Sequence, residues 1–132
     1  SRDNFTLNTP ALATLFFTNN QVQWINDNGG LAWADQRTKQ SSKVMFDWAE
    51  KTAIASPFVK DPNSRSQVVA TIDFEGVDAN QVAQVLRENG IVDTESYRKL
   101  GKNQLRIATF VSTPPEEFEA LTASIDYVLE RI

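Results

Sequence analysis

The most informative segment of this sequence runs from residue 67 to residue 90 and reads QVVATIDFEGVDANQVAQVLRENG. Its opening part, residues 67–74, is rich in β-branched side chains and apolar on both faces, which predicts a covered inner strand. Asp78 then begins a predicted helix, because a short acidic side chain there accepts hydrogen bonds from free backbone N–H groups. Asn89 and Gly90 end that helix, since glycine adopts the left-handed conformation at least cost.

Upstream of this segment, apolar residues recur at helical spacing. An Asn-Thr-Pro start at residues 8–10 opens one predicted helix, the glycine pair 29–30 closes it, and a second helix follows up to about Ala55. We therefore expect a helical pair over residues 1–56. Residues 57–66, where proline, asparagine and serine accumulate, form the predicted loop that changes the period from helical to extended.

Downstream of the segment, two extended runs and one more helix are expected. A short strand around residues 91–92 and a longer one over residues 104–110 flank the polar segment 93–102, which has the composition of a functional loop. Thr113, followed by two prolines and Glu116, predicts the start of the last helix, with the threonine as its cap.

The predicted order is α-α-β-α-β-β-α within a single domain over residues 1–132, whose α+β portion covers residues 67–132. Short connections favour a small, mostly antiparallel sheet covered by helices on one face. The expected fold class is therefore α+β.

The composition excludes several classes of function. The 132 residues carry a formal net charge of −4 and contain neither cysteine nor histidine. These absences exclude disulfides, cysteine-ligated zinc, a Ser/His/Asp triad and a histidine metal site within this chain, and no metal site or catalytic residue is assigned to it. The acidic balance argues against a nucleic-acid or anionic-membrane surface. Without a long apolar run or a signal-peptide pattern, we expect a cytoplasmic protein.

One candidate anion site lies at the start of the first predicted helix. Asn8 and Thr9 place side-chain donors beside free backbone N–H groups and the positive end of the helix dipole. Plain helix capping is the alternative interpretation, because most helices carry such a residue and bind no ligand.

The densest group of cationic residues lies in the polar segment before the last strand. Tyr97-Arg98-Lys99 is followed by Arg106, and arginine and lysine suit carboxylate or phosphate groups. A solvated loop is the alternative for Arg98 and Lys99. The charge of Arg106 inside an apolar strand must reach the surface or find a partner. Arg65 is a weaker candidate and is more typical of a surface or loop-fixing residue.

Five short motifs occur together in an order that is fairly specific for one enzyme family: Leu7-Asn-Thr-Pro10, Trp24-Ile-Asn-Asp-Asn-Gly-Gly-Leu31, Arg65-Ser66, Ser96-Tyr-Arg-Lys-Leu-Gly101 and Leu105-Arg106. With these motifs the chain resembles the C-terminal small domain of phosphoserine aminotransferase, and in particular the actinobacterial-type members of that family. The resemblance covers nearly the whole chain.

The resemblance implies a fold-type I aminotransferase that depends on pyridoxal 5′-phosphate and acts as a homodimer in serine biosynthesis. Such an enzyme interconverts 3-phosphohydroxypyruvate plus glutamate with phosphoserine plus 2-oxoglutarate. The Schiff-base lysine of the family lies in an N-terminal large domain, and none of the six lysines here matches its motif. The resemblance therefore implies that this chain alone is inactive and supplies anchors for the substrate and the cofactor.

The family's site residues carry over at matching positions. Asn8 and Thr9 match the pair that binds the cofactor phosphate of the neighbouring subunit. Arg106 matches the arginine that holds the substrate α-carboxylate, and Arg98 matches the one that holds the substrate phosphate. Tyr97 replaces the usual histidine. The family's short Gly-rich stretch is also replaced, by Lys99-Leu-Gly-Lys-Asn-Gln, in which Lys99 or Lys102 can restore the lost positive charge.

Two alternatives stay open on the sequence alone. One is a free-standing α+β module that binds anions or regulates another protein, which needs no lysine and is equally compatible with the absence of histidine and cysteine. The other is the small domain of another fold-type I aminotransferase with a different acceptor, because Tyr97 departs from the family pattern.

Overall fold

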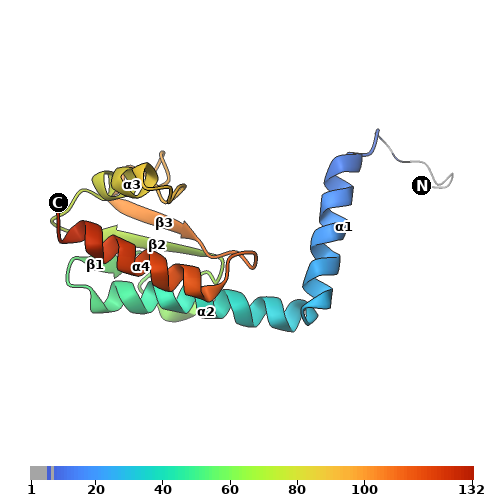
Figure 1. Ribbon diagram of the computed structural model, residues 1–132, viewed down its shortest axis with the longest axis horizontal. Coiled ribbons are helices and arrows are strands. Elements are labelled where there is room, and N and C mark those ends of the chain that lie inside the picture. Colours follow the sequence, from blue (N-terminus) through green and yellow to red (C-terminus); the bar gives the residue numbers. More distant parts are fainter. Residues whose placement is uncertain (1–5, 7) are drawn as a thin grey trace. The chain divides into compact units, whose positions relative to one another are not determined.

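The computed structural model describes Thr6 and residues 8–132, and the chain divides into two compact units, residues 1–34 and 35–132. Figure 1 shows the helices and strands of the chain. In chain order they are α1 (Leu12–Asp27), α2 (Gly30–Lys51), β1 (Ala55–Pro57), the short 3-10 helix η1 (Pro62–Ser64), β2 (Val69–Phe74), α3 (Ala79–Glu88), β3 (Gln104–Ala108) and α4 (Pro115–Leu129).

The first unit consists mainly of helix α1, which has no buried residue. Gly29 and Gly30 lie at the junction between α1 and α2, as predicted, and both have positive φ angles, of 115° and 70°. Close approach adds a second constraint, because a Cβ atom on Gly29 would lie 3.1 Å from the Cβ atom of Trp33. The Trp33 ring packs edge-on against Trp24, with 5.1 Å between the ring centroids.

The second unit contains a three-stranded antiparallel sheet in the order β1-β2-β3, so the expected α+β class is confirmed. Strand β2 is the inner strand, as predicted. Its burial alternates, however, with Ala70, Ile72 and Phe74 buried and the residues between them partly exposed. The prediction that both faces are covered is therefore wrong. Val69 and Thr71 are β-branched yet lie on the open face, because successive side chains of a strand point to opposite sides.

The third strand lies elsewhere than expected. Residues 91–92 were predicted as a strand, but the backbone N–H of Ile91 donates to the carbonyl oxygen of Leu86 at 2.9 Å and so completes the end of α3. One edge of the sheet is instead formed by β1, whose Ala55 pairs with Phe74 of β2. Strand β3 forms the other edge. The predicted second helix is correspondingly shorter than expected and ends at Lys51, because the chain must turn before β1.

Helices α2, α3 and α4 cover one face of the sheet, and all three contribute buried residues to one core. Figure 1 shows α4, in red, crossing in front of the strands. The indole N–H of Trp48 in α2 donates to the carboxylate of Asp126 in α4 at 2.8 Å, and the Trp48 ring also packs against Phe74. The largest fully buried apolar side chains of this core are Met45, Ile72, Leu105, Ile125 and Val82.

Of two predicted helix caps, the structure contains one and lacks the other. Asp78 caps α3 as predicted, since its carboxylate accepts the backbone N–H of Asn80 at 2.9 Å. Thr113 was expected to cap α4, but the capping position is Pro114, which makes no side-chain hydrogen bond. The prolines explain the shift, because a ring with φ near −70° suits a helix start and needs no hydrogen-bonded N–H.

Candidate functional site

The candidate site is built on the open face of the sheet, opposite the helices. Arg106 lies in β3 between the buried residues Leu105 and Ile107, so strand alternation places its side chain on the exposed side. Across the sheet it pairs with Thr71 of β2. Its backbone N–H donates to the carbonyl oxygen of Thr94 at 3.0 Å. This hydrogen bond holds the segment that precedes β3 beside the strand. Of the two alternatives expected for this charge, the surface or a partner, the structure shows that it reaches the surface.

Tyr97 lies against Arg106. The guanidinium carbon of Arg106 is 5.5 Å from the centroid of the Tyr97 ring, within the range of a cation–π contact. The structure thus brings together two of the four residues predicted to bind substrate. In this arrangement the tyrosine contacts the arginine expected to hold a carboxylate.

The loop that carries Tyr97 is held at its start by an ionic contact. The Nε atom of Arg87 in α3 donates to the carboxylate of Glu95 at 2.6 Å, and its Nη2 atom lies 3.3 Å from a carboxylate oxygen of Asp93. The Arg87 hydrogen bond holds the pKa of Glu95 below its ordinary value, against a smaller opposing effect of burial. Glu95 also forms a single antiparallel bridge with Leu105 of β3.

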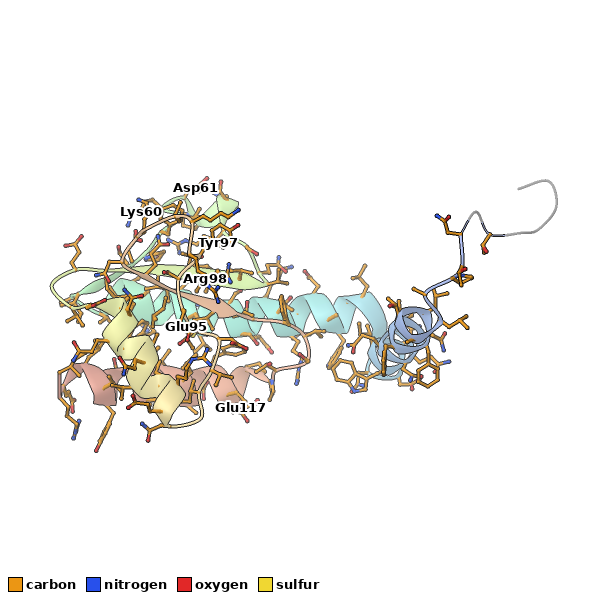
Figure 2. The ribbon with its side chains drawn as sticks, turned by 90° about the horizontal axis from the view of Figure 1, so that it is seen from above. Lys60, Asp61, Glu95, Tyr97, Arg98 and Glu117 are labelled. Carbon is orange, nitrogen blue, oxygen red and sulfur yellow. The ribbon has the colours of Figure 1, made fainter. Side chains whose placement is uncertain are left out.

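Arg98 faces a separate polar cavity of about 640 Å³. Figure 2 shows Tyr97 and Arg98 on the side of the molecule away from Glu117 of helix α4. Within the described residues, Arg98 has no hydrogen bond and no ion pair, so its guanidinium is available to an anion. Lys99 is exposed and does not line this cavity. The residues that line it are Asp78, Asn80, Ser96, Arg98, Gly101, Lys102 and Asn103.

Asn8 and Thr9 do not cap helix α1. The helix begins at Leu12 rather than at Pro10, its capping residue is Ala11, and no side chain forms a cap hydrogen bond there. Both the predicted helix start and the capping interpretation are therefore wrong. The cause is local, because the backbone N–H of Leu12 donates to the carbonyl oxygen of Pro10 at 2.9 Å and forms a tight turn at Ala11, so the helix begins only after that residue. Asn8 and Thr9 are exposed in the first unit.

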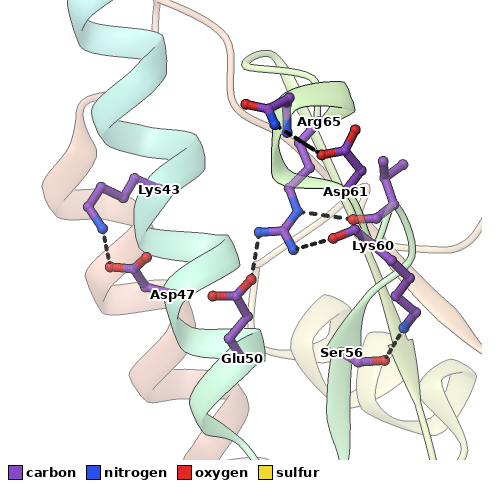
Figure 3. Close-up of polar contacts among 9 residues, drawn as sticks. Lys43, Asp47, Glu50, Ser56, Lys60, Asp61 and Arg65 are labelled. Carbon is purple, nitrogen blue, oxygen red and sulfur yellow. Dashed lines mark hydrogen bonds and ion pairs between the residues drawn. The ribbon is translucent and has the colours of Figure 1, made fainter.

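Arg65 fixes a loop, as expected. Its guanidinium pairs with the carboxylate of Glu50 at 2.7 Å and donates to the carbonyl oxygens of Val59 and Lys60 (Figure 3). It also lies 5.1 Å from the centroid of the Phe46 ring. Only 12% of this side chain is exposed, so its charge is already used inside the fold. Sequence patterns carry no signal for these partners, which come from helix α2 and from the loop after β1.

Two other kinds of site find no geometric support within Thr6 and residues 8–132. No group of three or more acidic side chains in this part of the chain is arranged to hold a metal ion. None of the helices that the structure describes combines the length and the apolarity needed to cross a membrane.

The sequence of this chain is similar to those of known proteins. No family model matches the chain. The phosphoserine aminotransferase of Rhodococcus jostii (strain RHA1) is 56% identical over 128 residues, which cover 96% of this chain and 34% of that protein. The phosphoserine aminotransferase of Nocardioides sp. (strain JS614) is 54% identical and is matched by all of this chain over 36% of its own length. The homologues of this chain are phosphoserine aminotransferases.

The chain spans about a third of the length of these relatives and corresponds to their C-terminal part. The resemblance inferred from the five motifs is thereby confirmed.

Solved phosphoserine aminotransferases share the fold of this chain. The protein from Cytophaga hutchinsonii superposes with a TM-score of 0.84 at 18% identity, over 99% of this chain and 35% of that one. The protein from Trichomonas vaginalis, solved with bound PLP, superposes with a TM-score of 0.80 at 20% identity, over 95% of this chain and 36% of that one.

Proposed function

We propose that this chain is the C-terminal anchoring domain of a phosphoserine transaminase, which interconverts 3-phosphohydroxypyruvate plus glutamate with phosphoserine plus 2-oxoglutarate. The observation that carries the proposal is the placement of two arginines at one loop–strand junction. Arg106 contacts Tyr97 beside β3, and Arg98 faces a separate polar cavity. A substrate with a carboxylate at one end and a phosphate at the other matches two such cations.

The two arginines have different roles in this proposal. Arg106 binds the α-carboxylate, which every amino-acid and keto-acid partner of the reaction carries. Arg98 binds the phosphate, which only the phosphorylated partner carries. A guanidinium suits both anions, because its planar fork donates two parallel hydrogen bonds. Together they orient the substrate so that its Cα–H faces the base, a positioning effect that lowers the entropic part of the barrier.

The cofactor in this proposal is pyridoxal 5′-phosphate, which supplies an electron sink for the bond cleavage at Cα when it is bound. Asn8 and Thr9 fit its phosphate group, since both side chains are exposed and neither is consumed by capping α1. They would donate hydrogen bonds to that phosphate from the neighbouring subunit of a homodimer. The lysine that moves the Cα proton belongs to the N-terminal large domain of the full-length parent, which we place in the cytoplasm.

The proposal is tested by comparing the two half-reactions in the full-length parent. Arg106→Ala should impair reaction with glutamate and with phosphoserine alike, whereas Arg98→Ala should chiefly impair reaction with phosphoserine. Removing one partner of such a charge pair costs about 2–5 kcal/mol, or roughly 30-fold to several-thousand-fold in specificity. Stopped-flow absorbance of the cofactor measures both half-reactions. Equal loss for both substrates in Arg98→Ala would contradict the assignment of the phosphate to this residue.

A further inference from the structure

The polar cavity beside Arg98 is lined by a second cationic residue, Lys102. One carboxylate, that of Asp78, also lines the cavity, but it is engaged by the backbone N–H of Asn80 at 2.9 Å and by the Asn80 side-chain amide at 3.1 Å. Within the described residues neither Arg98 nor Lys102 has an ion-pair partner. The hydrogen bonds on Asp78 come from neutral amide groups and leave its negative charge in place, so the two cations and one carboxylate that line the cavity give it an excess of one positive charge.

An aromatic ring from another part of the sequence holds the Lys102 ammonium. The Nζ atom of Lys102 lies 5.1 Å from the centroid of the Phe58 ring. Phe58 directly follows β1, and its backbone N–H donates to the carbonyl oxygen of Thr71 at 3.0 Å, which fixes the backbone at Phe58 relative to the sheet. The Phe58 side chain is partly exposed, and the contact with the ammonium gives it a role outside the core.

The backbone next to Lys102 is also fixed. The Asn103 side-chain amide donates to the carbonyl oxygens of Phe74 and Val77 at 2.9 and 2.7 Å, and its oxygen accepts the backbone N–H of Ala79 at 2.8 Å. On the other side, Gly101 turns the chain with φ of 62°. The backbone beside Lys102 is therefore fixed on its C-terminal side, which lowers the entropic cost of binding an anion there.

We propose that Lys102, positioned by the Phe58 ring, is the second cation that binds the substrate phosphate together with Arg98. The inference rests on the proposed function and deepens it. A phosphate monoester carries a charge of about −1.5 to −2 at neutral pH, so a single guanidinium leaves part of that charge uncompensated. The arginine supplies a planar pair of donors and the lysine a compact point charge. Lys99, the nearest rival in sequence, does not line the cavity.

The test uses the full-length parent and four variants: Lys102→Gln, Phe58→Leu, Lys99→Gln and the control Lys60→Gln. Lys60 is a neighbouring cation that lies outside the cavity and contacts Ser56 at 2.9 Å, so it reports the general effect of losing one positive charge. Lys102→Gln should weaken binding of inorganic phosphate and the half-reaction with phosphoserine roughly 10- to 100-fold, as expected for a hydrogen-bonded charge. The half-reaction with glutamate should stay at the wild-type rate.

Phe58→Leu keeps an apolar side chain but removes the aromatic ring. It should weaken phosphate binding about two- to fivefold, the size of an exposed cation–π contact, and should leave the glutamate half-reaction unchanged. A merely structural role of Phe58 would lower both half-reactions together. That result, or wild-type phosphate binding in Phe58→Leu, would overturn the positioning role.

The role of Lys102 is overturned if Lys102→Gln binds phosphate as the wild type does, or if Lys60→Gln or Lys99→Gln loses as much phosphate affinity as Lys102→Gln.

The phosphate titration also separates this inference from the proposed function. A wild-type parent that does not react with phosphoserine contradicts the proposed function. In that case a difference in phosphate affinity between wild type and Lys102→Gln still supports the two-cation cavity, and equal affinities overturn it.

Discussion

Arg106 and Tyr97 belong to different segments, yet the arginine side chain rests on the tyrosine ring. Both side chains are exposed, so the contact contributes little to folding and acts mainly by restricting where the guanidinium lies. A guanidinium held in one place loses less conformational freedom when it binds a carboxylate. We therefore interpret Tyr97 as a residue that positions Arg106.

Substitution of Tyr97 tests this interpretation in the full-length parent. Tyr97→Leu should weaken binding of glutamate and phosphoserine equally, by about two- to fivefold, which corresponds to a cation–π contact of about 0.5–1 kcal/mol. Tyr97→Phe should behave as the wild type, because the ring and not the hydroxyl contacts Arg106. Substrate titrations of the two half-reactions measure the effect. A loss confined to phosphoserine would place Tyr97 at the phosphate instead.

Asn8 and Thr9 offer a second test among single residues. Changing both to Ala in the full-length parent should weaken retention of pyridoxal phosphate, because two hydrogen-bond donors are lost. The thermal stability of the cofactor-free protein should not change, since neither residue caps α1. Absorbance of the retained cofactor after dialysis and thermal unfolding give the two readings. A dimeric double variant with full cofactor affinity would show that the phosphate is bound elsewhere.

The segment between α3 and β3 is anchored at both ends, although most of it has no regular secondary structure. Arg87 and Glu95 tie its start to α3, and the side chain of Asn103 ties its end to the carbonyl oxygens of Phe74 and Val77. Tyr97 and Arg98 lie between these two attachments. Candidate binding residues are thus presented by a loop on a rigid scaffold, a common arrangement of functional sites.

The anchor at Glu95 predicts a pH dependence of stability. The pKa of Glu95 is held below its ordinary value of 4.5, so the ion pair stabilises the folded chain at higher pH and is lost as the pH falls through the lowered pKa. Glu95→Gln should therefore lower the thermal stability of this chain modestly at pH 7, and the difference from wild type should disappear in acid. Glu119→Gln, at an exposed position on α4, is the control. A difference between wild type and Glu95→Gln that persists at low pH would contradict the ionic origin.

At the scale of the whole molecule, the chain has a core of its own in the second unit, residues 35–132, whereas helix α1 buries no residue. Large apolar side chains of α1 are exposed, including Leu15, Phe16 and Phe17. Exposed apolar surface of this kind is typical of an interaction surface. The exposed apolar side chains of α1 support the proposal that this chain packs against another part of a larger protein.

The isolated chain should fold but catalyse no transamination, because none of its six lysines matches the motif of the catalytic lysine. Visible absorbance with added pyridoxal phosphate, followed by borohydride reduction and mass spectrometry, measures covalent attachment. An amino-donor assay measures turnover. Stoichiometric attachment at one lysine together with turnover would contradict the proposed division of roles.

The sequence by itself determined the features that depend on neighbouring residues. The glycine pair 29–30, the cap at Asp78 and the presence of an inner strand within residues 67–74 were all predicted, because capping, positive φ and β-branched side chains act over a few residues. The alternating burial of that strand was not predicted. The resemblance also named candidate residues, such as Arg98 and Arg106, before the fold was known. It did not give their surroundings, and their roles stay predictions.

Only the tertiary structure decided which distant segments meet. The edge strand β1 was missed because three residues give too short a pattern, and pairing with β2 is what makes them a strand. The contact of Phe58 with Lys102 joins segments far apart in the sequence, and no local pattern specifies it. Which face of the sheet stays open depends likewise on where α2, α3 and α4 pack. Such contacts arise from the burial of a shared core, which is a property of the whole chain.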